Sequence, residues 1–326
     1  MLKHWCGLIL LILLNGCTAK IPQVGTQRGR LFDHHVHLMS PALIKSWQSM
    51  GIHFSRPDQS YANVDTILNN CGAVGLSLIA MGYVHTSAEF GAPGPEAYQK
   101  WQHENDYLAE AKLKYPGQIK AYFGVDPMHP QCMDEIVRCH QVLKMDGIKL
   151  HFNANQVYLT VPEHLQKVRP VFSYAATNEL PILLHFDNSH PKFGNPDVML
   201  LTDSILADLP FYHLQIAHFG TSGGFNERTK RVLDAMLLYF QNHPNSADKK
   251  IVLDISAVAL DKDSEGVSKL NVEEWQQLSA YCRKIGFDKI VFGSDYPLYN
   301  SPQYLNILIE KLNLNEQEIK QLLQTK

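Results

Sequence analysis

Short runs of apolar residues alternate along the chain with longer amphipathic stretches. The runs are rich in β-branched and aliphatic residues and indicate buried strands, whereas the amphipathic stretches carry apolar residues at helical spacing. Strands that alternate with helices form a parallel sheet covered by those helices. We expect eight strands, at Leu31–His37, Gly75–Val84, Lys120–Val125, Gly147–Leu150, Pro181–His185, His213–Ala217, Ile251–Ile255 and Lys289–Phe292.

Helix signals lie between these runs. Pro95–Tyr115 has helical spacing of apolar residues, and Pro162–Asn178 opens with proline in its first turn. Asn271 and Glu274 have the spacing of a capping box at the start of a further helix. Eight strand–helix units favour a closed (β/α)8 TIM-like barrel. An open, doubly wound sheet is the alternative, but no G-x-G-x-x-G motif follows a strand to support a dinucleotide-binding sheet.

Several of the apolar runs end in residue types that bind metals. The runs RLFDHHVHL, GIKLHF, PILLHFD, LQIAHFG and KIVFGSDYP carry these residues at or just past their ends, namely His35, His37, Lys149, His185, His218 and Asp295. In an α/β barrel the carboxyl ends of the strands form the rim where the chemistry takes place. We therefore expect a metal site at this rim.

The two histidines of the first run illustrate why the pattern matters. Side chains alternate along a strand, so His35 and His37 share a face and can bind one ion together, whereas His34 faces the other way. Any one of these histidines could instead be a hydrogen-bonded core residue. An aspartate such as Asp295 is costly to bury without a partner. Imidazole and carboxylate together suit zinc or a similar divalent ion.

The N-terminus predicts a targeting segment. An apolar run, Trp5–Leu14, follows a basic residue and is too short to span a membrane, which is typical of a secretory signal. It closes on a small residue directly before Cys17, and this resembles the bacterial lipoprotein signal. The resemblance implies a signal peptide at residues 1–16, lipidation of Cys17 with a tether to residue 30, and a periplasmic location on the outer membrane of a Gram-negative bacterium. The alternatives are a plain signal peptide or a buried N-terminal helix.

Composition narrows the picture further. The chain has 326 residues, of which 45% are hydrophobic, so residues 31–326 can form one large barrel domain. The net charge is -3 and no basic stripe is present, which argues against a nucleic-acid partner. We expect the four cysteines outside the signal to be small buried residues rather than disulfides: Cys71, Cys132, Cys139 and Cys282.

The motifs DHHVH, GIKLH, LLHFD, IAHFG and FGSDYP, which span Phe32 to Pro297, resemble the amidohydrolase superfamily, in its amidohydrolase-related branch. The resemblance implies one divalent metal, usually zinc, bound by His35, His37, His185 and Asp295. It also implies that Asp295 accepts a proton and that His218 orients or deprotonates a metal-bound water or polarises the substrate. In other branches a lysine at the position of Lys149 is carboxylated and bridges two metals, with His218 as a further ligand. A single metal is favoured here.

The substrate is predicted only as a class. Neutral imidazoles around a metal leave the site cationic, so we expect a small anionic or carbonyl-containing substrate. Lys149, His151, Asp187 and Asp254 are candidates to contact it. The first hypothesis is a metal-dependent hydrolase of a lactone, ester or amide, and the second is a decarboxylase with the same metal site. The third is a non-catalytic binding lipoprotein that retains the barrel. The resemblance also implies a homodimer.

Overall fold

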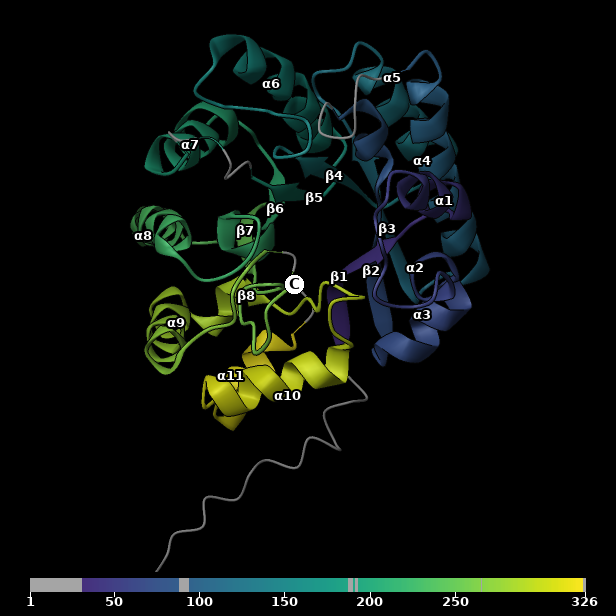
Figure 1. Ribbon diagram of the computed structural model, residues 1–326. Coiled ribbons are helices and arrows are strands. Elements are labelled where there is room, and N and C mark those ends of the chain that lie inside the picture. Colours follow the sequence, from purple (N-terminus) through teal and green to yellow (C-terminus); the bar gives the residue numbers. More distant parts are fainter. Residues whose placement is uncertain (1–30, 88–93, 187–189, 191–192, 265, 325–326) are drawn as a thin grey trace, which may run out of the picture.

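The computed structural model describes residues 31–87, 94–186, 190, 193–264 and 266–324. Cys17 with the predicted signal and tether, and the candidate Asp187, lie outside these residues. One parallel eight-stranded sheet runs in chain order (Figure 1). Its strands are β1 (Phe32–Leu38), β2 (Gly75–Ala80), β3 (Ile119–Val125), β4 (Gly147–His151), β5 (Ile182–His185), β6 (Tyr212–Ile216), β7 (Lys249–Asp254) and β8 (Ile290–Val291).

The sheet closes where β8 returns to β1. The backbone N–H of His34 donates to the carbonyl of Phe292 over 3.0 Å, and the N–H of His37 donates to the carbonyl of Tyr296 over 3.1 Å. Val36 forms an isolated parallel bridge with Tyr296. The predicted (β/α)8 barrel is therefore confirmed, and its seam between β1 and β8 depends on few backbone bonds.

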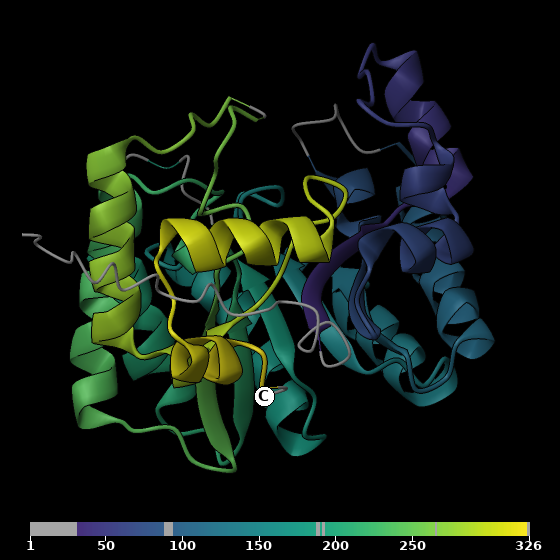
Figure 2. The ribbon, with the colours of Figure 1, turned by 90° about the horizontal axis from the view of Figure 1, so that it is seen from below.

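Helices surround the barrel (Figures 1 and 2), and none within the described ranges combines the length and apolar character needed to cross a membrane. The capping box predicted from Asn271 and Glu274 is present at the start of α9. The α-helices are α1 (Pro41–Ser49), α2 (Gln59–Ala62), α3 (Val64–Cys71), α4 (Ala97–Lys114), α5 (Cys132–Val137), α6 (Pro162–Thr177), α7 (Asn195–Leu200), α8 (Glu227–Asn242), α9 (Val272–Ile285), α10 (Ser301–Lys311) and α11 (Glu316–Leu322). Shorter 3-10 or π turns are η3 (Gly82–Thr86), η5 (Arg138–Val142), η6 (Leu201–Leu206), η7 (Ala217–Gly220) and η8 (Phe287–Lys289).

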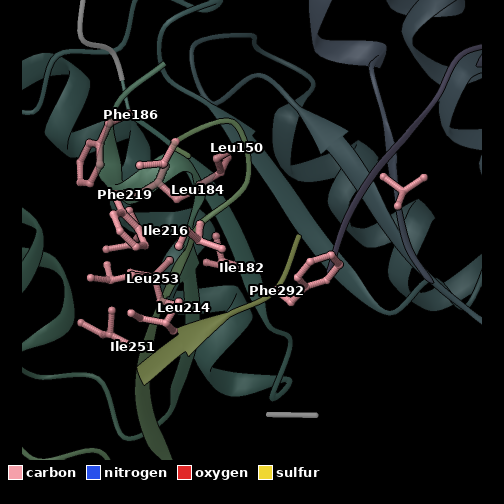
Figure 3. Packing of buried hydrophobic residues seen from close by; sticks show 14 of the residues in the cluster. Leu150, Ile182, Leu184, Phe186, Leu214, Ile216, Phe219, Ile251, Leu253 and Phe292 are labelled. Atoms are coloured by element: carbon pink, nitrogen blue, oxygen red, sulfur yellow. The ribbon is translucent and has the colours of Figure 1, made fainter. Parts of the chain in front are cut away.

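Apolar side chains on the outer faces of the strands form the main core against the helices (Figure 3). Leu150, Leu184, Ile216 and Leu253 are fully buried there. A small separate cluster comprises Ile79, Tyr122, Leu183 and Ala217. The four described cysteines are buried and free, as expected from the sequence. Because apolar side chains fill the outer faces, the polar residues of the strands are left to face inward near the C-terminal rim.

The predicted strand ends lie within two residues of the observed ones, except at the end of the second strand. The second strand was expected to reach Val84, but β2 ends at Ala80 and the chain turns into η3. Gly82 explains the turn, because a Cβ at this position would lie 2.5 Å from the Trp101 ring, so the backbone packs directly on that side chain. The last strand was expected at Lys289–Phe292, yet only Ile290–Val291 has strand geometry, since η8 takes up Lys289.

Candidate functional site

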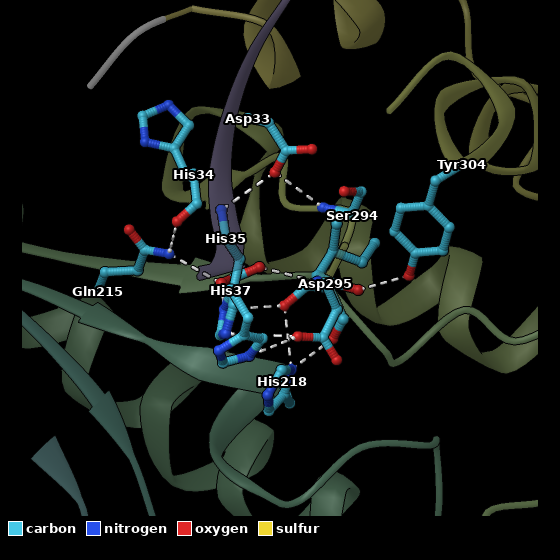
Figure 4. Close-up of polar contacts among 12 residues, drawn as sticks. Asp33, His34, His35, His37, Gln215, His218, Ser294, Asp295 and Tyr304 are labelled. Atoms are coloured by element: carbon cyan, nitrogen blue, oxygen red, sulfur yellow. Dashed lines mark hydrogen bonds and ion pairs between the residues drawn. The ribbon is translucent and has the colours of Figure 1, made fainter. Parts of the chain in front are cut away.

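The first strand presents two histidines to the inside of the barrel. His35 and His37 lie two residues apart on β1, with ring centroids 5.0 Å from each other. The pairing of β1 with β2 shifts register between Asp33 and Val36. Such a shift re-aims the side chains that follow it, and here both imidazoles come to face the same site (Figure 4).

Three residues from distant parts of the chain meet at the rim. Ligand atoms of His35, His218 and Asp295 all lie within 4.8 Å of one another. His218 and Asp295 both have φ of +52°, which a non-glycine residue rarely adopts. Strained backbone of this kind concentrates at functional sites, where the surrounding structure holds a side chain in place. Both side chains are therefore held at the rim at a cost in backbone energy.

His35 is oriented by residues behind it. Its Nδ1 lies 2.7 Å from Asp254 Oδ2, which also accepts from Gln215 Nε2 at 2.8 Å. The other oxygen of Asp254 accepts from the Ser256 N–H at 2.8 Å. Because this carboxylate acts as an acceptor throughout, the proton of neutral His35 is on Nδ1 and the lone pair of Nε2 faces the site. The sequence placed Asp254 among the candidate substrate contacts, and in the structure its carboxylate is bonded to His35.

The remaining histidines border this group. His218 Nδ1 donates to the Ser256 carbonyl over 2.8 Å, which leaves its Nε2 without the proton. His37 Nε2 lies 3.2 Å from Asp295 Oδ1. His185 Nε2 lies 3.0 Å from Ser222 Oγ, and its ring centroid is 5.0 Å from that of His218. The three residues with close ligand atoms, His35, His218 and Asp295, are called the geometric group below. The predicted ligands His37 and His185 lie beside this group.

Gln215 and Ser256 were not predicted as site residues. Gln215 is a polar residue between the buried apolar residues Leu214 and Ile216 of β6, and it also donates to the His34 carbonyl over 3.1 Å. The Ser256 hydroxyl lies 3.2 Å from His35 Nδ1 and 3.0 Å from His218 Nδ1. A polar residue in the middle of a buried strand was a signal for Gln215, whereas nothing in the sequence distinguishes Ser256.

Burial and charge determine the protonation of the site. Burial would raise the pKa of Asp295, but the neighbouring His218, His35 and His37 outweigh it and hold that pKa well below its usual range. Burial lowers the pKa of His35 and of His185 well below the ordinary value of 6.5. At neutral pH the imidazoles of His35 and His185 are therefore neutral and the Asp295 carboxylate is ionised, which are the ligand forms that a divalent cation requires.

We expect the metal-free protein to lose stability as the pH falls from 7.5 to 5.5. His35, His151 and His185 have folded pKa values below 6.5, so the unfolded chain binds more protons below that pH. Each such proton changes the free energy of unfolding by up to about 1.4 kcal/mol per pH unit. Burial raises the pKa of Asp33 to about 6 and also raises the pKa of Asp126, which opposes the trend, but these are two carboxyl groups against three histidines. Urea unfolding in chelator tests this, and equal or greater stability at pH 5.5 would contradict it.

Two residues of β4 lie inside the barrel next to the histidines. The rings of His151 and His185 are stacked with centroids 3.8 Å apart. His151 Nδ1 accepts the Ala154 N–H over 3.0 Å, so the proton of the neutral ring is on Nε2. Lys149 Nζ is buried without a hydrogen-bond partner in the described part of the chain, and burial lowers its pKa to about 7. His151 is therefore a fixed donor, and Lys149 lies close enough to add positive charge.

A pocket of about 490 Å³ opens onto His151. Its polar lining includes His151, His185 and Asp295, and its apolar lining includes Trp47 and Tyr83. The pocket can therefore hold a small molecule with one polar end and one flat apolar end. His85, one residue past the predicted second strand, faces Glu104 at 3.9 Å in a separate hollow between α1 and α4.

The donor set fits a divalent metal. His35 Nε2 is buried and has no hydrogen-bond partner within the described ranges, although Nδ1 of the same ring is firmly bonded. Two imidazoles and one carboxylate within 4.8 Å are typical of zinc, manganese or iron sites. His35, His218 and Asp295 would hold the ion, and the predicted ligands His37 and His185 lie next to Asp295 and His218 respectively. Which of these five bind the ion stays a prediction.

Comparison with known proteins agrees with this architecture. A family model described as amidohydrolase matches residues 33–325. No curated protein matches the chain in sequence.

The similar solved structures have low sequence identity to this chain. A 2,6-dihydroxybenzoate decarboxylase complexed with 2,6-dihydroxybenzoate aligns with a TM-score of 0.60 at 16% identity, over 90% of this chain and 96% of its own. A 5-carboxyvanillate decarboxylase from Sphingomonas paucimobilis aligns with a TM-score of 0.58 at 13% identity, over 90% of this chain and 96% of its own. A 5-carboxyvanillate decarboxylase from Novosphingobium aromaticivorans, with bound manganese, aligns with a TM-score of 0.60 at 17% identity, over 92% of this chain and 97% of its own. At these identities the likeness establishes the fold alone.

Proposed function

Because the chain belongs to the amidohydrolase family, we propose that it is a metal-dependent decarboxylase that releases CO2 from a small aromatic carboxylate. The observation that carries the proposal is the division of the pocket. A metal ion held beside the histidines, with the nearby Lys149, would supply the positive end, and Trp47 and Tyr83 supply the flat apolar wall. An anionic aromatic acid matches both ends. The solved structures that resemble this fold include decarboxylases of 2,6-dihydroxybenzoate and 5-carboxyvanillate, which have this chemistry.

Decarboxylation requires a residue of the pocket that can deliver a proton to the ring carbon. When the bond between the ring carbon and the carboxylate breaks, its electron pair stays on the ring carbon, and a proton must take the place of CO2. Asp295 is the carboxyl group that lines the described part of the pocket. Its ionised state allows it to take a proton from the substrate or solvent and deliver it to the ring carbon. His151, through Nε2–H, would hold an oxygen of the substrate during this transfer.

A divalent metal held by His35, His218 and Asp295 would supply a Lewis acid that draws the oxygen atoms of the substrate into place. We propose one such ion per chain, since the described donors form one group. The same pocket residues then restrict the substrate to a planar molecule whose charged end reaches the histidines. Metal analysis by emission spectroscopy should give one equivalent in the active protein.

The test is a substrate screen with two readouts. The protein is loaded with Mn²⁺ or Zn²⁺ and incubated with hydroxybenzoates and related aromatic acids, and CO2 release is measured beside the loss of substrate. We expect release of one CO2 for each acid consumed, and no release after chelation. Turnover of lactones, esters or amides, with none of any aromatic acid, would refute the proposal.

Hydrolysis is a second candidate because of one observation. Asp295 is ionised and lies 3.2 Å from His37 and 3.5 Å from His35, a setting in which a carboxylate can accept a proton from water. A hydrolase would use this acceptor on a lactone, ester or amide. The same screen separates the two, because hydrolysis consumes water and releases no CO2.

Replacing His151 with phenylalanine is expected to lower kcat/KM by about 10- to 100-fold, because the stacking on His185 is kept while the donor to an anionic substrate is lost. Steady-state kinetics with the acid identified by the screen measures the change. Metal content should stay the same. His140→Phe is the control, since His140 contacts Tyr174 away from the pocket. A His151→Phe protein with unchanged kcat/KM would contradict the assigned contact.

A further inference from the structure

Asp33 connects the two segments that carry His35 and Asp295. Its Oδ1 accepts the backbone N–H of His35 over 3.1 Å and the backbone N–H of Ser294 over 3.0 Å. Ser294 directly precedes Asp295. Figure 4 shows Asp33 between β1 and the segment that follows β8, with both of these bonds drawn. One oxygen atom thus joins the backbones beside two of the three residues in the geometric group.

These two N–H groups need the carboxylate because regular sheet pairing stops here. The register shift in β1 falls between Asp33 and Val36, so His35 has no paired position on β2. On the other side of the seam β8 is only two residues long, Ile290–Val291, and has ended before Ser294. A buried backbone N–H without a partner is costly. The side chain of Asp33 therefore replaces strand hydrogen bonds at the seam of the barrel.

The second oxygen of Asp33 is fixed separately. Oδ2 accepts from Ser301 Oγ over 2.6 Å, at the start of α10, and Cys71 Sγ lies 3.6 Å from it at the end of α3. Asp33 is completely buried, so all its contacts are with the protein. The carboxylate can neither rotate nor move without breaking bonds on both sides. The two oxygens therefore have different roles. Oδ1 binds the backbone of the two segments that carry His35 and Asp295, and Oδ2 binds side chains at the ends of α10 and α3.

We propose that Asp33 is a positioning residue that sets the separation of His35 and Asp295 for metal binding, although it touches neither the metal nor the substrate. This inference rests on the proposed metal-dependent function. It predicts that the contacts of Oδ1 matter for metal affinity and that those of Oδ2 matter mainly for stability. Residues that orient metal ligands typically change metal affinity by about 10- to 100-fold when they are replaced.

The experiment measures Mn²⁺ binding to the metal-free full chain by titration calorimetry, without substrate. Asp33→Ala removes the hydrogen bonds of both oxygens. Asp33→Asn keeps an oxygen that can accept both backbone N–H groups. Ser301→Ala removes only the main partner of Oδ2. We expect Mn²⁺ affinity to fall by about 10- to 100-fold in Asp33→Ala and to stay within about threefold in Asp33→Asn and Ser301→Ala. The electron paramagnetic resonance spectrum of bound Mn²⁺ should change only in Asp33→Ala.

The outcomes separate the inference from the proposed function. Circular dichroism confirms folding, and if Asp33→Ala does not fold, Asp33→Ser is measured in its place, because the shorter hydroxyl cannot span both N–H groups. Affinity within threefold of the unaltered chain in a folded Asp33→Ala or Asp33→Ser protein would overturn the inference alone. An equal loss in Ser301→Ala would do the same, since it would indicate a general anchoring effect. Absence of Mn²⁺ and Zn²⁺ binding by the unaltered chain would overturn the proposed function, and the inference with it.

Discussion

Replacing Asp295 with asparagine is expected to lower turnover by about 10²- to 10⁴-fold while the barrel stays folded. The amide has nearly the same size and can keep the contact with His37, which is 3.2 Å away in the present site. It cannot hold and deliver a proton, and as a neutral group it is a weaker metal ligand. Turnover is measured with the acid found by the screen, at a metal concentration that saturates the variant, so that the loss reports the proton transfer.

Asp146→Asn provides the matched control for this substitution. Asp146 lies just before β4, at the opposite end of the barrel, and forms an ion pair of 2.7 Å with Lys112. Its replacement should leave turnover unchanged. If the Asp295→Asn protein, saturated with metal, turns over within threefold of the unaltered chain, then Asp295 does not move the proton and the reaction needs a different donor.

The alternation of apolar runs and amphipathic stretches was sufficient to predict the barrel, because it reports burial, and burial dictates both the strands and the faces of the helices. It could not locate every strand end. Met81–Val84 is as apolar as a strand, but Gly82 packs on Trp101 and the chain turns there. That contact joins β2 to a helix about 20 residues further on, and hydrophobic periodicity has no information about such a contact.

The site could be predicted as a rim of histidines with one aspartate, because chain order and strand direction place all strand ends together. The arrangement of these residues within the rim could not be predicted. His218 joins His35 and Asp295 because its backbone adopts φ of +52°, and no sequence pattern specifies this. The contact of Asp254 with His35 could not be predicted either, since it joins β7 to β1 past the short strand β8.

The network behind His35 explains how a buried imidazole keeps one nitrogen available to a metal. Donors converge on both oxygens of Asp254: His35 Nδ1 and Gln215 Nε2 on one, and the Ser256 N–H on the other. Only a carboxylate can accept at both positions. Because a histidine bonded at Nδ1 has its lone pair on Nε2, this arrangement fixes the tautomer of His35 before any metal binds.

Replacing Asp254 with asparagine should therefore weaken Mn²⁺ binding by about 10- to 100-fold, with a comparable loss of turnover at limiting metal. An amide must direct its NH2 group either at the Ser256 N–H or at His35 and Gln215, so one donor always meets another. In the second orientation the proton of His35 moves to Nε2 and blocks the nitrogen that faces the site. Titration calorimetry measures the loss, and excess metal should restore part of the turnover.

The control for this prediction is a buried carboxylate outside the site. Glu135 is fully buried and bonded to Asn105 and Arg138, so Glu135→Gln should lower the melting temperature without changing Mn²⁺ affinity. If Asp254→Asn lowers the melting temperature in the same way but leaves the affinity unchanged, then His35 does not depend on Asp254 for its tautomer. In that case the hydroxyl of Ser256, 3.2 Å from the same nitrogen, would be the group that orients it.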